Sequence, residues 1–327
     1  MANSSIASVT VAYNGASVLR RHLDSLRRQT RKLDEIVVVD NASSDDTTNL
    51  LRSEYPEVTV LNQGENKGVG GGLACGLSYA ALDQKHDWVW LFDQDSVPEP
   101  DALERLLIAF QELESPPERI GILGSWCVHS KTGMTFPGLC WKRGKFEQAP
   151  SPQENISFSD SVITAGTLIH REALKVVGLP RADFFIDFVD HEHCFRLRRH
   201  GFSIAVIRDS VLEHAIGEPR KINILGWTKF WTDHVPWREY YMTRNLVFTI
   251  WHDYPQAKAF ISYCLLKHVV GMLFFGQKKL ACLSMMYRGF LDGRAGRLGI
   301  RFLPHDPDGH RELPTRVEGE AYAGRIS

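Results

Sequence analysis

Residues 88–95 read W-V-W-L-F-D-Q-D, five apolar residues followed by two carboxylates that stand two positions apart. The apolar run predicts a β-strand that ends at the carboxylates. A second run, E-I-V-V-V-D at residues 35–40, lacks the alternation of a half-buried strand, which favours a strand covered on both faces. Together the two runs predict an α/β protein with polar chemistry where its strands end.

Strand and helix patterns alternate around these two runs. Further strands are predicted at residues 6–13, 58–61, 120–128, 162–170 and 203–207. Helices are predicted at residues 18–29, from Asp46 to Leu51, at 68–82, at 101–113, from Arg171 and at 191–200. In the first half this β-α-β-α order predicts a mostly parallel sheet with right-handed crossovers.

The chain divides into a large α/β domain at 1–250, with halves at about 1–115 and 116–250, and a helical C-terminal extension at 251–327. Ser115-Pro116-Pro117 predicts a break between the halves, and the Gly- and Pro-rich residues 130–160 predict a loop with a hairpin. Two helices are expected at 255–275 and 278–291, joined at Gly276. The polar tail after Pro304 is expected to be loosely ordered.

Composition excludes several classes of protein. The 327 residues carry 38 Lys+Arg and 39 Asp+Glu, a net charge of -1, which rules out a globally basic nucleic-acid binder. A hydrophobic content of 43% rules out a disordered chain. The six cysteines form no CxxC pair and predict reduced, mostly buried thiols and hence a cytoplasmic protein. The N-terminus resembles no signal peptide.

Polar residues follow four predicted strands where each one ends. The carboxyl ends of neighbouring parallel strands share one edge of a sheet, and ligands bind there. The candidates are Tyr13 and Asn14, Asp40 and Asn41, Asn66 and Lys67, and Asp93, Gln94 and Asp95.

The carboxylates of Asp93 and Asp95 can aim at one hard cation. Oxygen ligands suit Mg²⁺ or Mn²⁺, which would hold a substrate diphosphate. The alternative is a solvated acidic turn. His214 could be a neutral imidazole ligand of the same cation, or a satisfied or surface histidine.

The glycines at 68 and 70–72 do not form a dinucleotide fingerprint. They follow the third strand, and neither they nor the turn after the first strand match G-x-G-x-x-G; no P-loop motif is present either. Enzymes that use NAD and P-loop NTPases are therefore disfavoured. Close helix–sheet packing and the approach of a ligand both explain these glycines.

A third group of candidates lies in F-F-I-D-F-V-D-H-E-H at residues 184–193. Carboxylates among aromatic residues are costly to bury without a role. Asp190 lies near the start of a short helix, whose dipole favours the ionised form and a role as a base. The alternatives are a plain N-cap for Asp190 and an i,i+4 ion pair of Glu192 with Arg196.

Taken together, these motifs resemble the family 2 glycosyltransferases of the GT-A fold. The resemblance runs from Val9 to about Asn245 and rests on V-T-V-A-Y-N-G, V-V-V-D-N-A-S-S-D-D-T, E-N-K-G-V-G-G-G, L-F-D-Q-D-S, T-A-G-T-L-I-H and F-I-D-F-V-D-H-E-H-C-F-R-L. The D-Q-D-S form and F-I-D-x-V-D-x-E are similar to the bacterial rhamnosyltransferase branch. The sequence departs from many relatives at His193, where they carry an aromatic residue.

The resemblance implies an inverting transfer of a sugar in the synthesis of cell-surface polysaccharide. It implies that Asp190 deprotonates the acceptor hydroxyl, that Asp95 and His214 hold Mg²⁺ or Mn²⁺, and that the donor is dTDP-L-rhamnose. Residues implied in substrate binding are Tyr13, Asn14, Asp40, Asn41, Asn66, Lys67, Asp93, Gln94 and Glu192, with Asp40 at the base and Asp93 near the ribose. An inactive nucleotide-sugar-binding scaffold and a nucleotidyltransferase are the competing functions.

Residues 256–301 carry eight Lys and Arg against the single Asp292, a net charge of +7, among many aliphatic and aromatic residues. Lys267 and His268 interrupt the apolar run, so no uncharged stretch of membrane-spanning length is expected. The pattern favours a helix on an anionic membrane surface, at the inner face of the cell membrane, which suits a saccharide acceptor linked to lipid. A cap on the catalytic domain and a homodimer interface are the alternatives.

Overall fold

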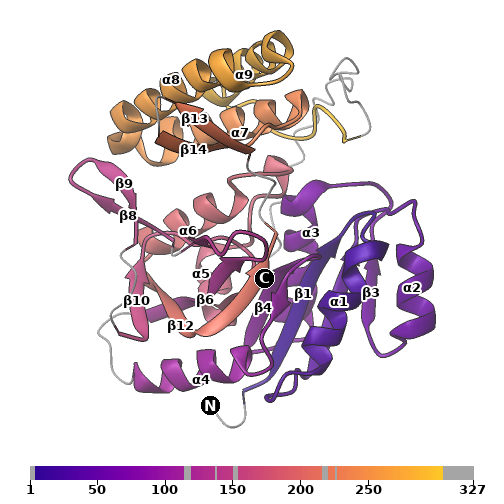
Figure 1. Ribbon diagram of the computed structural model, residues 1–327. Coiled ribbons are helices and arrows are strands. Elements are labelled where there is room, and N and C mark those ends of the chain that lie inside the picture. Colours follow the sequence, from indigo (N-terminus) through magenta and orange to yellow (C-terminus); the bar gives the residue numbers. More distant parts are fainter. Residues whose placement is uncertain are drawn as a thin grey trace, which may run out of the picture.

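The computed structural model describes residues 4–113, 119–136, 138–149, 154–215, 220–224 and 227–304 (Figure 1). For residues 222–224 and 227–230 only the backbone is described. The predicted break at Ser115-Pro116-Pro117 and the predicted tail at 305–327 lie outside the described residues.

A central sheet of ten strands organises the described part of the chain. The path of hydrogen-bonded neighbours is β10-β12-β6-β11-β4-β1-β2-β3, while β5 pairs with β12 and β7 with β6. The strands are β1 (Ile6–Ala12), β2 (Glu35–Asp40), β3 (Thr59–Asn62), β4 (Trp88–Asp93), β5 (Val97–Pro98), β6 (Arg119–His129), β7 (Thr135–Phe136), β10 (Ile156–Ser159), β11 (Thr167–His170) and β12 (Phe202–His214).

The predicted parallel order holds for the first half of the chain. The pairs β1–β2, β1–β4 and β2–β3 are parallel, and so is β6–β12. Strand β11 runs antiparallel to both β4 and β6 and joins the two parallel groups. The carboxyl ends of β1 to β4 therefore meet at one edge of the sheet.

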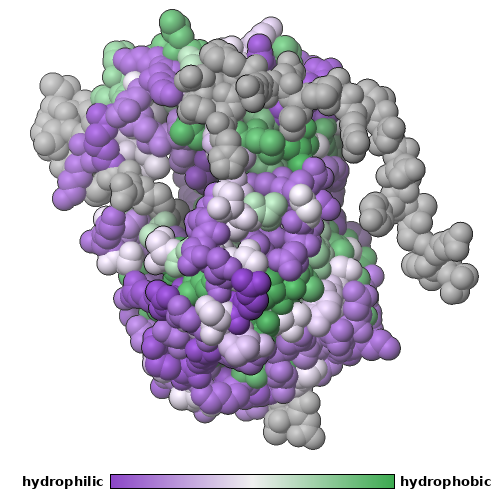
Figure 2. Space-filling model, turned by 90° about the vertical axis from the view of Figure 1, so that its right-hand side faces the viewer, coloured by the Kyte–Doolittle hydropathy of each residue, from purple (hydrophilic) through white to green (hydrophobic). Residues whose placement is uncertain are grey.

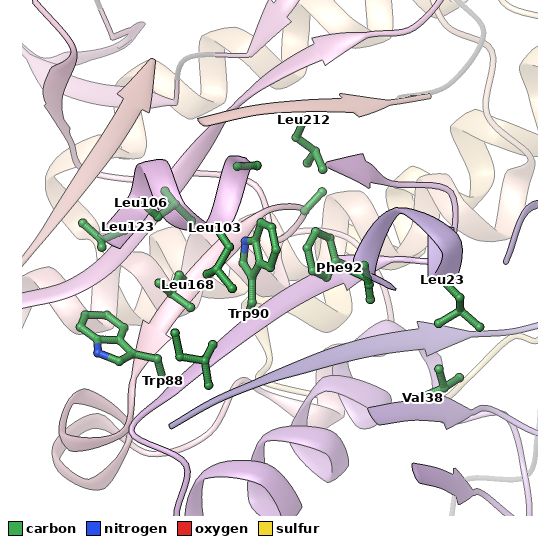
Figure 3. Close-up of a cluster of buried hydrophobic side chains, with 14 of the residues drawn as sticks. Leu23, Val38, Trp88, Trp90, Phe92, Leu103, Leu106, Leu123, Leu168 and Leu212 are labelled. Carbon is green, nitrogen blue, oxygen red and sulfur yellow. The ribbon is translucent and has the colours of Figure 1, made fainter. Parts of the chain in front are cut away.

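Helices cover both faces of the sheet. Side chains alternate along each strand, so Trp88, Trp90 and Phe92 pack on α1, α2 and α4 while Val89 and Leu91 pack on α3, α5 and α6. Figure 3 shows the first of these clusters around Trp90. The helices are α1 (Ala16–Arg27), α2 (Thr47–Glu54), α3 (Gly68–Leu77) with a π-helical continuation at Ser78–Asp83, α4 (Ala102–Glu112), α5 (Arg171–Val177) and α6 (Val189–Arg199).

The glycines of α3 serve close packing of this helix on the sheet. A Cβ atom at Gly72 would lie 2.5 Å from Val11 Cγ1, and one at Gly76 would lie 2.3 Å from Val9 Cγ1. Both distances are far below van der Waals contact, so only glycine allows the helix to approach β1 so closely. Of the two explanations given for the glycine-rich segment, the structure supports packing at these positions.

A helical layer lies above the sheet in Figure 1. It comprises α7 (Pro236–Phe248), α8 (Lys258–Phe275), α9 (Lys279–Arg294), a π-helical turn at Thr249–Asp253, a 3₁₀ turn at Pro255–Ala257 and the hairpin of β13 (Arg220–Ile224) and β14 (Trp227–Trp231). Helix α9 packs along α7, while α8 lies on the outside. The predicted domain boundary at 250 falls between α7 and these outer helices and stays a prediction.

Several predicted boundaries were wrong. The predicted strand 203–207 extends to His214 in β12, past a register shift between Ile207 and Val211. The predicted strand 162–170 begins only at Thr167, after Gly166 at a φ of 75°. Residues 130–160 contain the expected hairpin, β8 (Leu139–Lys142) with β9 (Lys145–Gln148), but also β7 and β10 of the main sheet. The hairpin β13–β14 was not predicted.

All six cysteines are free thiols. Cys127, Cys140, Cys194 and Cys282 are buried, while Cys75 and Cys264 are partly buried. Burial raises the pKa of the Cys194 thiol to about 12, so this group stays protonated and unreactive at neutral pH. The prediction of reduced, mostly buried thiols is confirmed.

Candidate active site

A cleft of about 660 Å³ opens at the sheet edge where β1 to β4 end. The loop before α6 and the first turn of α7 form its opposite wall. Most of the predicted site residues line it, namely Tyr13, Asn14, Asn41, Asn66, Asp93, Gln94, Asp95, Asp190 and His214. Asp40, Lys67 and Glu192 are not among the lining residues. The fold thus brings together residues that lie up to 200 positions apart in the chain.

His214 lies between the two carboxylates that follow β4. Its Nε2 is 3.3 Å from Asp93 Oδ2, and its Nδ1 is 3.1 Å from Asp95 Oδ1. Burial lowers the pKa of His214, but the hydrogen bonds and charges of Asp93 and Asp95 outweigh burial and raise it to about 10. The imidazolium therefore offsets one of the two carboxylate charges in this structure. The length of β12 is what carries His214 to this point.

Gln94 joins the ends of β4 and β1. Its Oε1 accepts a hydrogen bond of 2.8 Å from the Tyr13 amide, and its Nε2 donates to the Tyr13 carbonyl at 3.3 Å. A Cβ atom at Gly15 would lie 2.4 Å from Gln94 Oε1, so a larger residue there would displace the Gln94 amide from this position. Asn14 adopts a φ of 48°, and its Oδ1 accepts from the Ser44 amide at 2.8 Å. Gln94 and Asn14 thus shape the cleft wall through backbone contacts.

Asn41 fixes the turn that opens α3. Its Oδ1 accepts from the Lys67 amide at 2.9 Å, and its Nδ2 donates to Asn66 Oδ1 at 3.0 Å and to the Gly68 carbonyl at 2.9 Å. Asn66 Oδ1 also accepts from the Gly68 amide. The Lys67 side chain is exposed at the rim of this turn. The contacts hold Asn41 and Asn66 at the cleft.

Asp40 lies below the cleft floor and is 4% exposed. Its Oδ1 accepts from the Ser43 amide at 3.1 Å, and its Oδ2 accepts from the Thr48 hydroxyl at 3.0 Å. In this arrangement Asp40 orders the loop before α2. Its implied contact with the nucleotide base stays a prediction.

Asp190 stands in the first turn of α6, where the helix dipole stabilises negative charge. Its Oδ1 accepts a hydrogen bond of 2.7 Å from the His191 amide, and its side chain lines the cleft. The loop before it is strained, because Phe185, Asp187 and Phe188 adopt φ values of 66°, 60° and 65°. Non-glycine residues with positive φ cost free energy and persist only where the surroundings hold them.

Helix α7 holds this strained loop in place. Asn245 Nδ2 donates to the carbonyls of Phe184, Ile186 and Asp187 at 3.0, 2.8 and 2.8 Å. The fully buried Arg244 donates to the carbonyls of Asp183 and Phe184, each at 3.0 Å. Burial lowers the pKa of Arg244, and the carbonyl oxygens compensate its charge.

Glu192 lies away from the cleft. Its side chain is 2% exposed, and its two oxygens accept from Arg196 Nε at 2.9 Å and Nη2 at 3.0 Å. Arg196 in turn donates to the carbonyls of Val177 and Leu179. Glu192 therefore forms the i,i+4 ion pair that was given as the alternative to substrate binding. Through Arg196, this pair ties α6 to the end of α5.

The cleft-wall residues that sequence patterns missed include Asp187, His191, Trp237 and Arg238. His191 Nδ1 lies 2.5 Å from the hydroxyl of the buried Ser161, which orients the imidazole. Arg238 pairs with Asp187. The sequence did offer one signal for this wall, the polar residues within the apolar segment W-R-E-Y-Y-M-T-R-N at 237–245. Arg and Asn are rare on the buried side of a helix.

Within the described residues no group of three or more His, Cys, Asp and Glu side chains is arranged to hold a metal ion. The donor types do fit one. Carboxylate oxygens suit Mg²⁺ and Mn²⁺, and neutral imidazole is a common metal ligand. A cation between Asp93 and Asp95 would require His214 to lose its proton and its present contacts with them.

Comparisons with known proteins agree with this geometry. Residues 8–116 match the family model described as glycosyl transferase family 2. The dTDP-rhamnosyl transferase RfbF of Shigella flexneri is 28% identical over 247 residues, which cover 74% of this chain and 79% of that protein. The galactofuranosyltransferase GlfT1 of Mycobacterium tuberculosis is 29% identical over 218 residues, 65% of this chain and 71% of that protein.

Two solved structures share the fold. GalNAc-T7, solved with UDP, GalNAc and Mn²⁺, aligns at a TM-score of 0.55 and 16% identity over 77% of this chain. This chain spans 49% of the length of GalNAc-T7. TarS 1–349 of S. aureus, solved with UDP, aligns at a TM-score of 0.54 and 12% identity over 89% of this chain and 90% of TarS 1–349.

The sheet and its flanking helices have the GT-A fold of glycosyltransferases, with a cleft at the strand ends. Within that class of fold, residues 8–116 are similar to the family 2 glycosyltransferases.

Proposed function

We propose that the protein catalyses an inverting sugar transfer, with Asp190 as the base that deprotonates the acceptor. The observation that carries the proposal is the arrangement of the cleft. Asp93 and Asp95 line it from the strand ends, while Asp190 lines it from the first turn of α6. A displacement at the anomeric carbon needs a base on one face of the sugar and the leaving diphosphate on the other.

In the proposed reaction the acceptor oxygen forms a bond to the anomeric carbon as the bond from that carbon to the diphosphate oxygen breaks. The proton of the acceptor hydroxyl passes to Asp190 Oδ2, because Oδ1 is held by the His191 amide. The clamp of α7 on the loop before α6 fixes the position of this carboxylate.

The strand ends form the proposed donor side. Tyr13, Asn14 and Asn66 line the part of the cleft next to β1 and β3, and Asp93 lies at the end of β4. Asp95 and His214 would hold Mg²⁺ or Mn²⁺. Such a cation, when bound, neutralises charge on the departing diphosphate.

The proposed donor is dTDP-L-rhamnose, and the acceptor is a saccharide, free or linked to lipid. The name of RfbF, a dTDP-rhamnosyl transferase, supports this donor. GlfT1, with nearly the same identity, is a galactofuranosyltransferase and makes a galactofuranose donor the competitor. Measuring hydrolysis of a panel of nucleotide sugars decides between them.

The variant Asp190→Asn tests the base. It keeps the size of the side chain and its bond from the His191 amide, but it cannot accept the proton. We expect transfer to fall at least a hundredfold while calorimetry shows donor binding within twofold of wild type. The matched control is Asp101→Asn, at the start of α4 and paired with Arg105, which should leave both unchanged. Equal turnover of Asp190→Asn and wild type contradicts the proposal.

The same measurements separate the two competing functions. An inactive scaffold binds nucleotide sugars but neither hydrolyses nor transfers any of the panel. A nucleotidyltransferase consumes a nucleoside triphosphate and releases pyrophosphate from it, which the proposed enzyme does not.

A further inference from the structure

The outer face of α8 exposes a stripe of large apolar side chains. The outer face of α8 is defined by Tyr263, Leu266, Val270, Leu273 and Phe274, each between 44% and 72% exposed. They follow one another at intervals of three, four, three and one residues, which places them on one side of the helix. A contiguous exposed apolar patch of this kind marks an interaction surface.

Helix α9 extends this surface. Leu280 and Tyr287, seven residues apart, are 85% and 65% exposed. Helix α9 also contacts α8, so the exposed residues of the two helices belong to one region. Figure 2 shows some green, hydrophobic side chains at the top of the molecule, among purple, hydrophilic ones.

The opposite side of α8 is fixed to the protein. His268 Nε2 lies 3.0 Å from Glu239 Oε2 of α7, and the His268 ring stacks on Trp231 at 5.4 Å between centroids. A Cβ atom at Gly271 would lie 2.3 Å from the Trp231 ring, so the helix approaches this ring closely. Helix α8 therefore has an inner side that packs on α7 and Trp231 and an outer face that is exposed.

Pro255–Phe275 is long and apolar enough to cross a membrane by length and composition, and only 11% of its most apolar window is buried. This criterion tolerates charged residues, so it leaves standing the expectation that no uncharged stretch reaches spanning length, since Lys258 and Lys267 lie within the segment. His268 faces α7 rather than the outside, so it does not interrupt the outer face.

Exposed cations flank the outer face. Lys267, Lys279 and Arg288 are exposed. The single acidic residue of the segment 256–301, Asp292, is buried and accepts from the Tyr240 hydroxyl at 2.7 Å and from Arg297 Nε at 2.7 Å. The surface thus combines apolar side chains with exposed positive charge, which complements an anionic lipid headgroup layer.

We propose that the outer face of α8, together with Leu280 and Tyr287, docks on an anionic lipid bilayer with α8 lying parallel to its surface. A second copy of the chain fits less well, because a two-fold interface would bring the same cations of both copies together. Crossing the bilayer would break the contacts of His268 and Gly271 with α7 and β14. If the proposed function holds, docking brings the cleft to an acceptor linked to lipid.

Flotation of the full chain with vesicles tests the proposal. One set of vesicles contains phosphatidylcholine with phosphatidylglycerol, and the other contains phosphatidylcholine alone. We expect the protein to float with the anionic vesicles, to bind them at least tenfold more tightly than the neutral ones, and to be released by high salt or alkaline carbonate. The assay needs neither donor nor acceptor, so its outcome is independent of the proposed function.

Two variants locate the surface. Leu266→Ser/Leu273→Ser/Phe274→Ser removes apolar area from residues that contact little of the protein, and we expect at least tenfold weaker binding. Lys267→Glu/Lys279→Glu should weaken binding at least tenfold as well, since each lysine near an anionic surface strengthens binding about fivefold. The control Leu82→Ser/Ile108→Ser changes exposed apolar residues elsewhere and should bind like wild type. Unchanged melting temperatures show that the variants fold.

Three outcomes would overturn the proposal. The first is no flotation of wild type with anionic vesicles. The second is binding that resists alkaline carbonate, which assigns a membrane-spanning role to Pro255–Phe275. The third is a wild-type dimer in analytical ultracentrifugation that the triple serine variant dissociates, without vesicle binding by either protein, which assigns the outer face to a second copy.

Discussion

Asp187 and Arg238 form a bidentate ion pair in the wall of the cleft. Arg238 Nη2 donates to Asp187 Oδ1 at 2.8 Å, and Nε donates to Oδ2 at 2.9 Å. Burial lowers the pKa of Arg238, but the hydrogen bonds and charge of Asp187 outweigh it and raise the pKa above its ordinary value. The pair connects α7 to a residue at a φ of 60°, three positions before the proposed base.

We expect Asp187→Asn to reduce transfer at least tenfold, mainly in kcat. The variant removes the charge that holds Arg238, so the strained loop relaxes and Asp190 loses its position. Steady-state kinetics check this, and Arg238→Lys should retain more activity than Arg238→Met because it keeps the charge. A change confined to KM for the donor would instead place the pair in donor binding.

Asn245→Ala should destabilise the protein by about 1–3 kcal/mol, because the carbonyl oxygens of Ile186 and Asp187 lose their side-chain donor. Denaturant unfolding measures this loss. Asn245→Asp is the sharper variant, since it keeps the shape but brings a carboxylate against the same carbonyls. Asn49→Ala, at an exposed position of α2, is the control and should change stability by less than about 0.5 kcal/mol. Equal stability of Asn245→Ala and wild type would refute the clamp.

Chelation of divalent metal should abolish transfer if Asp95 and His214 hold a cation. We expect EDTA to remove activity, Mn²⁺ or Mg²⁺ to restore it, and Asp95→Ala to lose metal-dependent donor binding. Calorimetry with and without the metal measures the difference. Full activity after chelation would leave the His214 imidazolium, which lies between Asp93 and Asp95, as the positive charge of the site.

The protein should become less stable as the pH is lowered, because His193 takes up a proton on unfolding. Burial and the charge of Arg196 lower the pKa of His193 to about 3, against its donor bond to the Gly178 carbonyl. In the unfolded chain His193 binds a proton near pH 6.5, whereas in the folded protein it stays neutral at that pH. Acid therefore favours unfolding. Between pH 7 and pH 5 the loss is about 2 kcal/mol, at 1.36 kcal/mol per pKa unit. Denaturant unfolding at both pH values should show a smaller loss for His193→Gln.

Gly76→Val should be strongly destabilising. Even a Cβ atom there meets Val9 Cγ1 at 2.3 Å and Val39 Cγ2 at 3.1 Å, so a branched side chain forces α3 away from the sheet. We expect a loss of about 1–3 kcal/mol or more in denaturant unfolding. Gly64→Val is the matched control, because a Cβ atom at Gly64 has nothing within 4 Å. A similar stability of both variants would contradict the packing role of Gly76.

Local sequence determined the sheet edge and the residues that meet there. The apolar run at 88–92 had to be buried, and a strand buried on both faces places the carboxylates after it at the sheet edge. For the same reason Tyr13, Asn41 and Asn66 were predictable as cleft residues. Tyr13 and Asn41 follow their strands directly and Asn66 lies in the turn after β3, so their positions depend on the hydrophobic pattern and on the rule that neighbouring parallel strands end together.

Only the tertiary structure decided the opposite wall of the cleft. His214 reaches Asp93 and Asp95 because β12 continues past a register shift that no local pattern reveals. Arg238 and Asn245 act on a loop more than fifty residues earlier in the chain, through a strained backbone that isolated sequence would not adopt. Glu192 carries the chemistry of a binding residue, yet Arg196 occupies both of its oxygens. Contacts distant in sequence depend on packing, and packing is a property of the whole fold.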